Sequence, residues 1–148
     1  MFKQLDMGSI KSALAHWLRQ KIGDPGLEVV NMRTPGAGGM SNDTILFETQ
    51  DRGGRVHERL VARLAPTEQF VFPTYDLSVQ FNIMGRLADC GIPVPETRWL
   101  EEDTEILGTP FYIMGAVDGE APSDVPSYHT AGLCVDADAG QRETLWWS

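Results

Sequence analysis

The stretch Pro35-Gly-Ala-Gly-Gly-Met-Ser-Asn-Asp43 lies between two apolar segments that are typical of β-strands. The segment before it is Leu27-Glu-Val-Val-Asn-Met-Arg33, and the segment after it is Thr44-Ile-Leu-Phe-Glu-Thr-Gln50. Two strands joined by a glycine-rich turn predict a β-hairpin. Glycine lacks a Cβ atom and adopts positive φ readily, so the backbone N–H groups of such a loop can come close to an anion. An ordinary flexible hairpin loop has the same composition, and the loop alone leaves both interpretations open.

The segments around this hairpin predict two helices and three more strands. Ser9 is a suitable N-cap for a first helix over residues 9–20, whose apolar residues recur with helical spacing at Ile10, Ala13, Leu14, Trp17 and Leu18. A second helix is expected over 75–90, and strands are expected over 55–64, 97–100 and 110–115. The tail from residue 139 predicts the first turns of a further helix.

Composition restricts the class of protein. A chain of 148 residues with 42% hydrophobic and 22% charged residues suits one soluble globular domain. A net charge of −9 disfavours nucleic acid and anionic membranes as partners, and no apolar run approaches the roughly 20 residues that span a bilayer. The N-terminus lacks the features of a signal peptide, and Cys90 and Cys134 are not spaced as a CxxC pair. We therefore expect reduced thiols and a cytoplasmic location.

One cation stands at the end of an apolar strand. The run Leu60-Val-Ala-Arg63 is expected to be buried in a sheet, and a buried arginine needs an anionic partner. A carboxylate from the following helix or a bound phosphate would meet this need. A third possibility is that the side chain reaches water along the edge of its strand. The residues alone do not choose among the three.

Four pieces of the sequence together resemble the aminoglycoside phosphotransferase family, whose members include relatives of choline kinase. They are Gly38-Gly-Met-Ser-Asn42, Leu60-Val-Ala-Arg63, Gly91-Ile-Pro-Val-Pro95, and Pro110-Phe-Tyr-Ile-Met114 followed by Asp118-Gly119. The resemblance implies an α+β fold, the N-terminal lobe of a protein kinase with about five antiparallel strands and helices, and a C-terminal helical lobe that is absent. It divides the chain into an N-terminal helix (1–26), the small nucleotide-binding lobe (27–117), and a hinge with the start of the missing lobe (118–148).

The resemblance also implies roles for single residues. Gly38, Gly39, Ser41 and Asn42 would cover the phosphates of ATP. Arg63 stands where these kinases usually have a lysine that reaches the phosphates, and Gln80 stands where they usually have the glutamate that pairs with it. Met114 would lie behind the adenine, with backbone groups of Gly115 and Val117 at its edge. Val61 and Ile113 would form the walls around the purine.

The parts that would catalyse phosphate transfer are not expected in this chain. In the family, the catalytic aspartate and the Mg²⁺ ligands lie in the large lobe, and Asp136 and Asp138 follow no such pattern, so we interpret them as surface residues. We therefore expect no catalytic and no metal-binding residues. The predicted function is the ATP-binding lobe of a small-molecule phosphotransferase that is catalytically incomplete, with Mg²⁺ and the acceptor bound only in a full-length enzyme.

A second class of function stays open at this point. The chain could instead be a stand-alone lobe without catalytic activity that binds nucleotide or another protein. The underside of the sheet and the adjacent Trp146 and Trp147 would need an apolar partner, and we expect a homo-oligomer that hides them. Stable self-association would favour this second class.

Overall fold

The computed structural model describes residues 6–35, 43–66, 76–119 and 126–147. The chain forms two compact units, Met1–Ala116 and Val117–Ser148. Within the described residues, the first unit contains a sheet with three helices and the second contains two short helices. Each unit is described below by itself.

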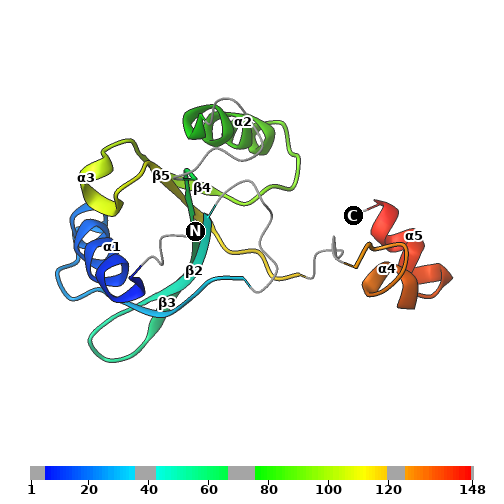
Figure 1. Ribbon diagram of the computed structural model, residues 1–148, viewed down its shortest axis with the longest axis horizontal. Coiled ribbons are helices and arrows are strands. Elements are labelled where there is room, and N and C mark those ends of the chain that lie inside the picture. The colour runs from blue at the N-terminus through cyan, green and yellow to red at the C-terminus, as the bar shows by residue number, and fades with distance from the viewer. Residues whose placement is uncertain (1–5, 36–42, 67–75, 120–125, 148) are drawn as a thin grey trace. The chain divides into compact units, whose positions relative to one another are not determined.

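The first unit is built on a five-stranded antiparallel sheet with the order β1-β2-β3-β5-β4 (Figure 1). Its strands are β1 (Glu28–Arg33), β2 (Asp43–Gln50), β3 (Val56–Leu64), β4 (Thr97–Glu101) and β5 (Phe111–Gly115). All four pairs of neighbouring strands are antiparallel. The predicted α+β fold with the five-stranded sheet of a kinase-like small lobe is thus confirmed.

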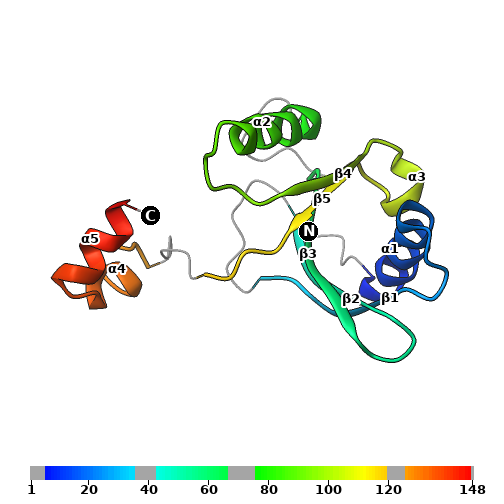
Figure 2. The same cartoon turned by 180° about the vertical axis from the view of Figure 1, so that it is seen from behind.

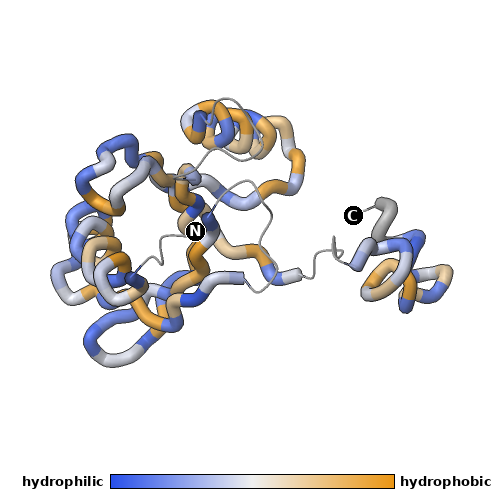
Figure 3. Tube along the Cα trace, viewed as in Figure 1, coloured by the Kyte–Doolittle hydropathy of each residue, from blue (hydrophilic) through white to orange (hydrophobic). Residues whose placement is uncertain are grey.

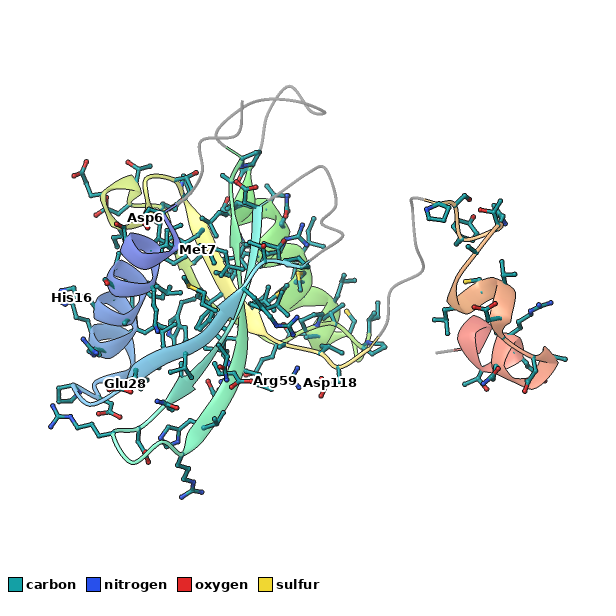
Figure 4. The ribbon with its side chains drawn as sticks, turned by 60° about the horizontal axis from the view of Figure 1, so that its bottom comes forward. Asp6, Met7, His16, Glu28, Arg59 and Asp118 are labelled. Carbon is teal, nitrogen blue, oxygen red and sulfur yellow. The ribbon has the colours of Figure 1, made fainter. Side chains whose placement is uncertain are left out.

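Helix α1 (Met7–Ile22) covers one face of this sheet. Its N-cap is Asp6 and not Ser9 as predicted: the Asp6 carboxylate accepts hydrogen bonds from Gly8 N, at 3.1 Å, and from the Ser9 hydroxyl. The hydrogen bond from Ser9 is the main reason why the pKa of Asp6 is lowered. His16 lies on the outer side of the helix, away from the sheet (Figure 4). The predicted apolar stripe faces the sheet, and with it forms a core that includes Leu14, Leu18, Ile45, Phe47, Leu60, Leu64, Phe111 and Ile113.

Trp17 joins α1 to the far edge of the sheet. Its ring contacts Phe111 and Trp99, with ring centroids 4.9 Å and 6.2 Å away. Its Nε1–H donates a hydrogen bond of 2.8 Å to Glu101 Oε2, which also accepts Lys21 Nζ at 3.4 Å. The short helix α3 (Thr104–Leu107), which the sequence did not predict, follows β4 and contacts α1. Apolar packing, the hydrogen bond to Glu101 and a further one from Arg19 Nε to Leu27 O, at 2.7 Å, therefore hold the first helix in place.

Helix α2 (Leu77–Asp89) lies against β4 and β5, as the view from behind shows (Figure 2). The Asp76 carboxylate caps its N-terminus by accepting from Ser78 N and Val79 N, at 2.9 Å and 3.2 Å. Hydrophobic residues recur along this helix (Figure 3). Those that face the sheet are buried or half-buried, whereas Val79 and Ile83 are 49% and 51% exposed. The helix thus uses only part of its apolar surface within the first unit.

The second unit contains α4 (Leu133–Asp136) and α5 (Ala139–Trp147). The sequence predicted α5 but not α4, which is only one turn long. The Asp138 side chain accepts from Gln141 N at 2.8 Å, and Asp138 N donates to Gln141 Oε1 at 2.8 Å. This reciprocal pair is a capping box. Asp136 and Asp138 are exposed, as predicted.

Candidate functional site

The loop that was predicted to cover phosphates joins two neighbouring strands. β1 ends at Arg33 and β2 begins at Asp43, and the two strands pair antiparallel, so the predicted hairpin is present. Gly38, Gly39, Ser41 and Asn42 lie outside the described residues. Their predicted contacts with phosphate therefore stay predictions.

The strand that leads into this loop contains a β-bulge. The register of β1 against β2 shifts between Val30 and Arg33, and Asn31 has a φ of 51°. Asparagine tolerates this left-handed conformation better than most residues. Its Nδ2 donates to Glu48 Oε2 on β2 at 2.6 Å. Because a bulge bends its strand and strengthens the local twist, Asn31 sets the direction in which β1 enters the loop.

The register of the strands defines which side chains share the face opposite α1. Directly opposed residues of antiparallel strands point to the same side of the sheet. Arg63 is paired with Thr44 on β2 and Tyr112 on β5, and Val61 is paired with Leu46 and Met114. We call these six residues the Arg63 face: Thr44, Leu46, Val61, Arg63, Tyr112 and Met114.

Of the six residues of the Arg63 face, only Arg63 is charged, and Arg59, two residues before Val61 on β3, points to the same side of the sheet. Val61 is 7% exposed, and Leu46 and Met114 are half-buried. Arg63 is half-buried near the end of β3. Thus the sequence-predicted residues Val61, Arg63 and Met114 do come together on one surface.

Ile113 does not belong to this surface. It pairs with Ala62, is fully buried, and packs in the core beneath α1. Successive residues of a strand point to opposite faces, so Ile113 and Met114 cannot both line the same site. The prediction that Ile113 forms a wall around the purine is wrong, whereas Val61 and Met114 can still do so.

Tyr112 is a member of the Arg63 face that sequence reasoning missed. Its side chain is 1% exposed, its ring lies 5.9 Å from the ring of Phe81, and its hydroxyl donates to Met84 Sδ at 3.7 Å. Burial raises the pKa of Tyr112, and the positive charge of Arg63 acts in the opposite direction. Strand alternation backward from Met114 would have placed Tyr112 on this face.

Gln80 was predicted to pair with Arg63. It lies on α2 one residue before Phe81 and is half-buried, so it is near the side of the helix that meets the sheet. Neither Arg63 nor Gln80 lacks an interaction partner. Their pairing with one another stays a prediction.

At the end of β5, two backbone N–H groups already form hydrogen bonds within the first unit. Gly115 N–H donates to Glu96 O and Ala116 N–H donates to Arg59 O, both at 2.9 Å. If Gly115 meets the edge of a purine, it must therefore do so through its carbonyl group. Val117 is the first residue of the second unit and is 71% exposed. Its predicted backbone contact with the purine stays a prediction.

Two negative findings apply to the part of the chain that the structure describes. It holds no group of three His, Cys, Asp or Glu side chains that could bind a metal ion. Every described helix is too short or too polar to span a lipid bilayer.

Comparison with known proteins identifies the family. Residues 33–140 match the sequence model of the phosphotransferase enzyme family (APH). The chain belongs to this family. The match begins at the last residue of β1 and includes all of β2 to β5, α2 and the Arg63 face. The resemblance that the four sequence pieces indicated is thereby confirmed.

This phosphotransferase-family chain is similar to parts of two longer proteins. A 76-residue stretch, 51% of the chain, is 38% identical to acyl-CoA dehydrogenase family member 10 of Mus musculus and covers 6% of that protein. The crystal structure of a candidate aminoglycoside phosphotransferase from Ralstonia eutropha JMP134 superimposes with a TM-score of 0.53 and 27% sequence identity. That alignment covers 74% of the present chain and 28% of the other. The chain therefore spans a minor part of both proteins.

Proposed function

We propose that this chain binds ATP on the Arg63 face and serves as the nucleotide-binding lobe of a small-molecule phosphotransferase. The observation that carries the proposal is the register of β3 and β5, which brings Arg63, Val61 and Met114 onto one face beside β2, the strand that follows the predicted phosphate loop. Membership of the phosphotransferase enzyme family supports it. In this proposal residues 27–117 form the binding lobe, residues 1–26 are a helical extension, and residues 118–148 begin a hinge and a further lobe.

The chemistry of the face suits the two halves of a nucleotide. A guanidinium is always charged at physiological pH and offers several N–H donors in one plane, which match phosphate oxygens. Such charge-assisted hydrogen bonds are stronger than neutral ones. Val61 and Met114 lie one pair further along the same strands and would pack against an apolar purine ring. The glycine loop and Ser41 and Asn42 would supply further donors to the phosphates.

The reaction itself is assigned at the level of class. Transfer of a phosphate from ATP to an alcohol group of a small acceptor is what we propose for the whole protein, since the similar structure from Ralstonia eutropha JMP134 is a candidate aminoglycoside phosphotransferase. Mg²⁺ normally neutralises the charge that develops in this reaction. The described residues hold no cluster that fits such an ion, so we assign no step to it.

The proposal is tested by comparing ATP with adenosine. We expect ATP to bind with a dissociation constant of about 1 mM, which corresponds to roughly −4 kcal/mol. Arg63→Gln should lower the affinity for ATP by about tenfold or more, because a hydrogen bond to a charged group contributes about 1.5–3 kcal/mol. Adenosine should bind equally well to both proteins, since it carries no phosphate.

The matched control is Arg55→Gln, which removes the same charge from an exposed position before the other end of β3. This variant should bind ATP like the wild type. Equal loss of ATP affinity in the two variants would show that only the net charge matters. Equal loss of ATP and adenosine in Arg63→Gln would show that Arg63 supports the fold and not the phosphates.

A second candidate function is a module that binds nucleotide or protein without catalysing transfer. The exposed Val79 and Ile83 on α2 favour it, because apolar side chains on one helix face often mark contacts between proteins. We propose that the partner is a second copy of the chain, so that the protein forms a homo-oligomer. Light scattering should then report a mass that rises with concentration in the wild type and stays monomeric in Val79→Ser/Ile83→Ser.

A further inference from the structure

Tyr112 connects the second helix to the centre of the Arg63 face. It is on β5, and its side chain is enclosed by α2: Phe81 contacts its ring, and the sulfur of Met84, about one turn later on the same helix, accepts a hydrogen bond from its hydroxyl. A thioether sulfur is a weak acceptor, so this bond orients the hydroxyl more than it stabilises the fold. With its O–H directed at Met84, the tyrosine oxygen can still accept a hydrogen bond from another donor.

Tyr112 and Arg63 lie on the same side of the sheet. The two residues are directly paired across β3 and β5. Arg63 acts electrostatically on Tyr112, where it opposes the effect of burial on the tyrosine pKa. The attraction between a cation and a hydroxyl oxygen is strong in such a poorly solvated site. Their pairing and this electrostatic interaction are the grounds for linking the position of Arg63 to Tyr112.

We propose that Tyr112 is a positioning residue that holds the Arg63 guanidinium in place for the phosphate groups of a nucleotide. The inference rests on the function proposed above, because it explains how the cation of that site is oriented. Tyr112 itself would not touch the ligand. Since Phe81 and Met84 both lie on α2, any movement of that helix would pass through Tyr112 to the phosphate-binding cation.

The first test needs no ligand. Arg63 in ¹⁵N-labelled protein gives an Nε–Hε signal whose heteronuclear NOE reports how ordered the guanidinium is. Tyr112→Phe removes only the hydroxyl, and we expect it to lower this NOE and shift the Arg63 signal. Tyr128→Phe changes an exposed tyrosine of the second unit and should leave both unchanged. An unchanged Arg63 signal in folded Tyr112→Phe would overturn the proposal.

The second test uses inorganic tripolyphosphate, which has no purine. Tyr112→Phe should lower the affinity for tripolyphosphate by about three- to tenfold, which is the scale of one impaired charge-assisted hydrogen bond. The affinity for adenosine should change by less than about twofold. In wild-type protein with ¹³Cζ-labelled tyrosine, tripolyphosphate should raise the pKa of Tyr112, because the anion offsets the charge of Arg63 that lowers it. An equal loss of tripolyphosphate and adenosine in Tyr112→Phe would contradict the positioning role.

A further variant covers the case in which Tyr112→Phe does not fold. Met84→Leu keeps the apolar volume on α2 and removes the sulfur acceptor, and it should change the Arg63 signal in the same direction. An Arg63 signal that is unaffected in Met84→Leu would then refute the inference. Failure of the proposed function is recognised separately, because wild-type protein would bind neither ATP nor tripolyphosphate while the Arg63 signal still responds to Tyr112→Phe.

Discussion

Replacing Glu101 by glutamine tests whether one charged hydrogen bond fastens the first helix to the sheet. The Glu101 carboxylate accepts from Trp17 Nε1 at 2.8 Å, from Asp103 N at 3.1 Å, and from Lys21 Nζ at 3.4 Å. Glutamine has nearly the same shape and keeps one oxygen acceptor. The substitution therefore removes the charge and leaves the packing of Trp17 in place.

The expected loss follows from these contacts. A hydrogen bond to a charged group contributes about 1.5–3 kcal/mol and a neutral one about 1 kcal/mol, so the bond from Trp17 loses about 1 kcal/mol. The ion pair with Lys21 is partly exposed, with side-chain exposures of 39% and 17%, and adds at most about 1 kcal/mol. We expect Glu101→Gln to lower the free energy of unfolding by about 1–2 kcal/mol. This corresponds to a fall in Tm of about 2–8 °C.

Thermal unfolding followed by circular dichroism measures this loss, with Glu102→Gln as the control. Glu102 is exposed and lies next to Glu101, so the control makes the same charge change beside the network. An equal fall in Tm for both variants would show that the specific contacts of Glu101 contribute nothing.

The dependence of stability on pH gives a second, independent test of the role of Glu101. The hydrogen bond from Trp17 is the main cause that lowers the pKa of Glu101 in the folded protein from its ordinary value of 4.5. Its contribution is therefore complete above about pH 4.5 and is lost as the pH falls through the lower folded-state value. The difference in stability between wild type and Glu101→Gln should be full at pH 7 and shrink in acid. A difference that grows in acid would refute the account.

Two further substitutions test the packing and the end of the first helix. Leu14 is fully buried in the core, so Leu14→Ala should lower the free energy of unfolding by about 2–5 kcal/mol, measured by urea denaturation; a loss below about 1 kcal/mol would contradict the packing of α1 on the sheet. Gly23 ends α1 with a φ of 77° and would have no steric contact at Cβ, so Gly23→Ala should cost about 1–2 kcal/mol through backbone strain alone. An unchanged Tm in Gly23→Ala would show that the helix does not end in this conformation.

The two long helices and the strands could be predicted from the sequence, and the one-turn helices α3 and α4 could not. The apolar spacing of Leu14, Trp17 and Leu18 indicated α1, but its start was placed at Ser9 because serine is also a good N-cap. In the structure Ser9 donates to the true cap, Asp6. The helix α3 was missed because four residues show no periodicity, although Asp103 at its start and Gly108 at its end are typical capping residues.

The faces of β5 were also misassigned from the sequence. Phe111, Tyr112 and Ile113 are all buried, so this strand shows no alternation of apolar and polar residues. A strand covered on both faces gives a continuous apolar run, so its hydrophobicity does not mark one face as the core side, although alternation still puts Ile113 and Met114 on opposite faces. Without such a mark, Ile113 was wrongly placed beside the purine and Tyr112 was overlooked. The register with Arg63 resolves both cases.

The sequence could not identify which group interacts with Arg63. A carboxylate, a phosphate or water could each have satisfied its charge, and composition did not choose among them. The structure places it half-buried beside apolar Val61 and Met114, next to a tyrosine that α2 encloses. The domain bounds at residues 26 and 117 and the roles of the glycine loop stay predictions.

The most direct test of the central claim is to map where ATP binds, using methyl-labelled protein and NMR titration. We predict that ATP shifts the methyl signals of Val61 and Met114 together with the Arg63 Nε signal, and leaves the methyl signals of Ile113 and Leu64 on the α1 side of the sheet unchanged. Shifts confined to Ile113 and Leu64, or no shift of Val61 and Met114 at saturating ATP, would contradict a nucleotide site on the Arg63 face.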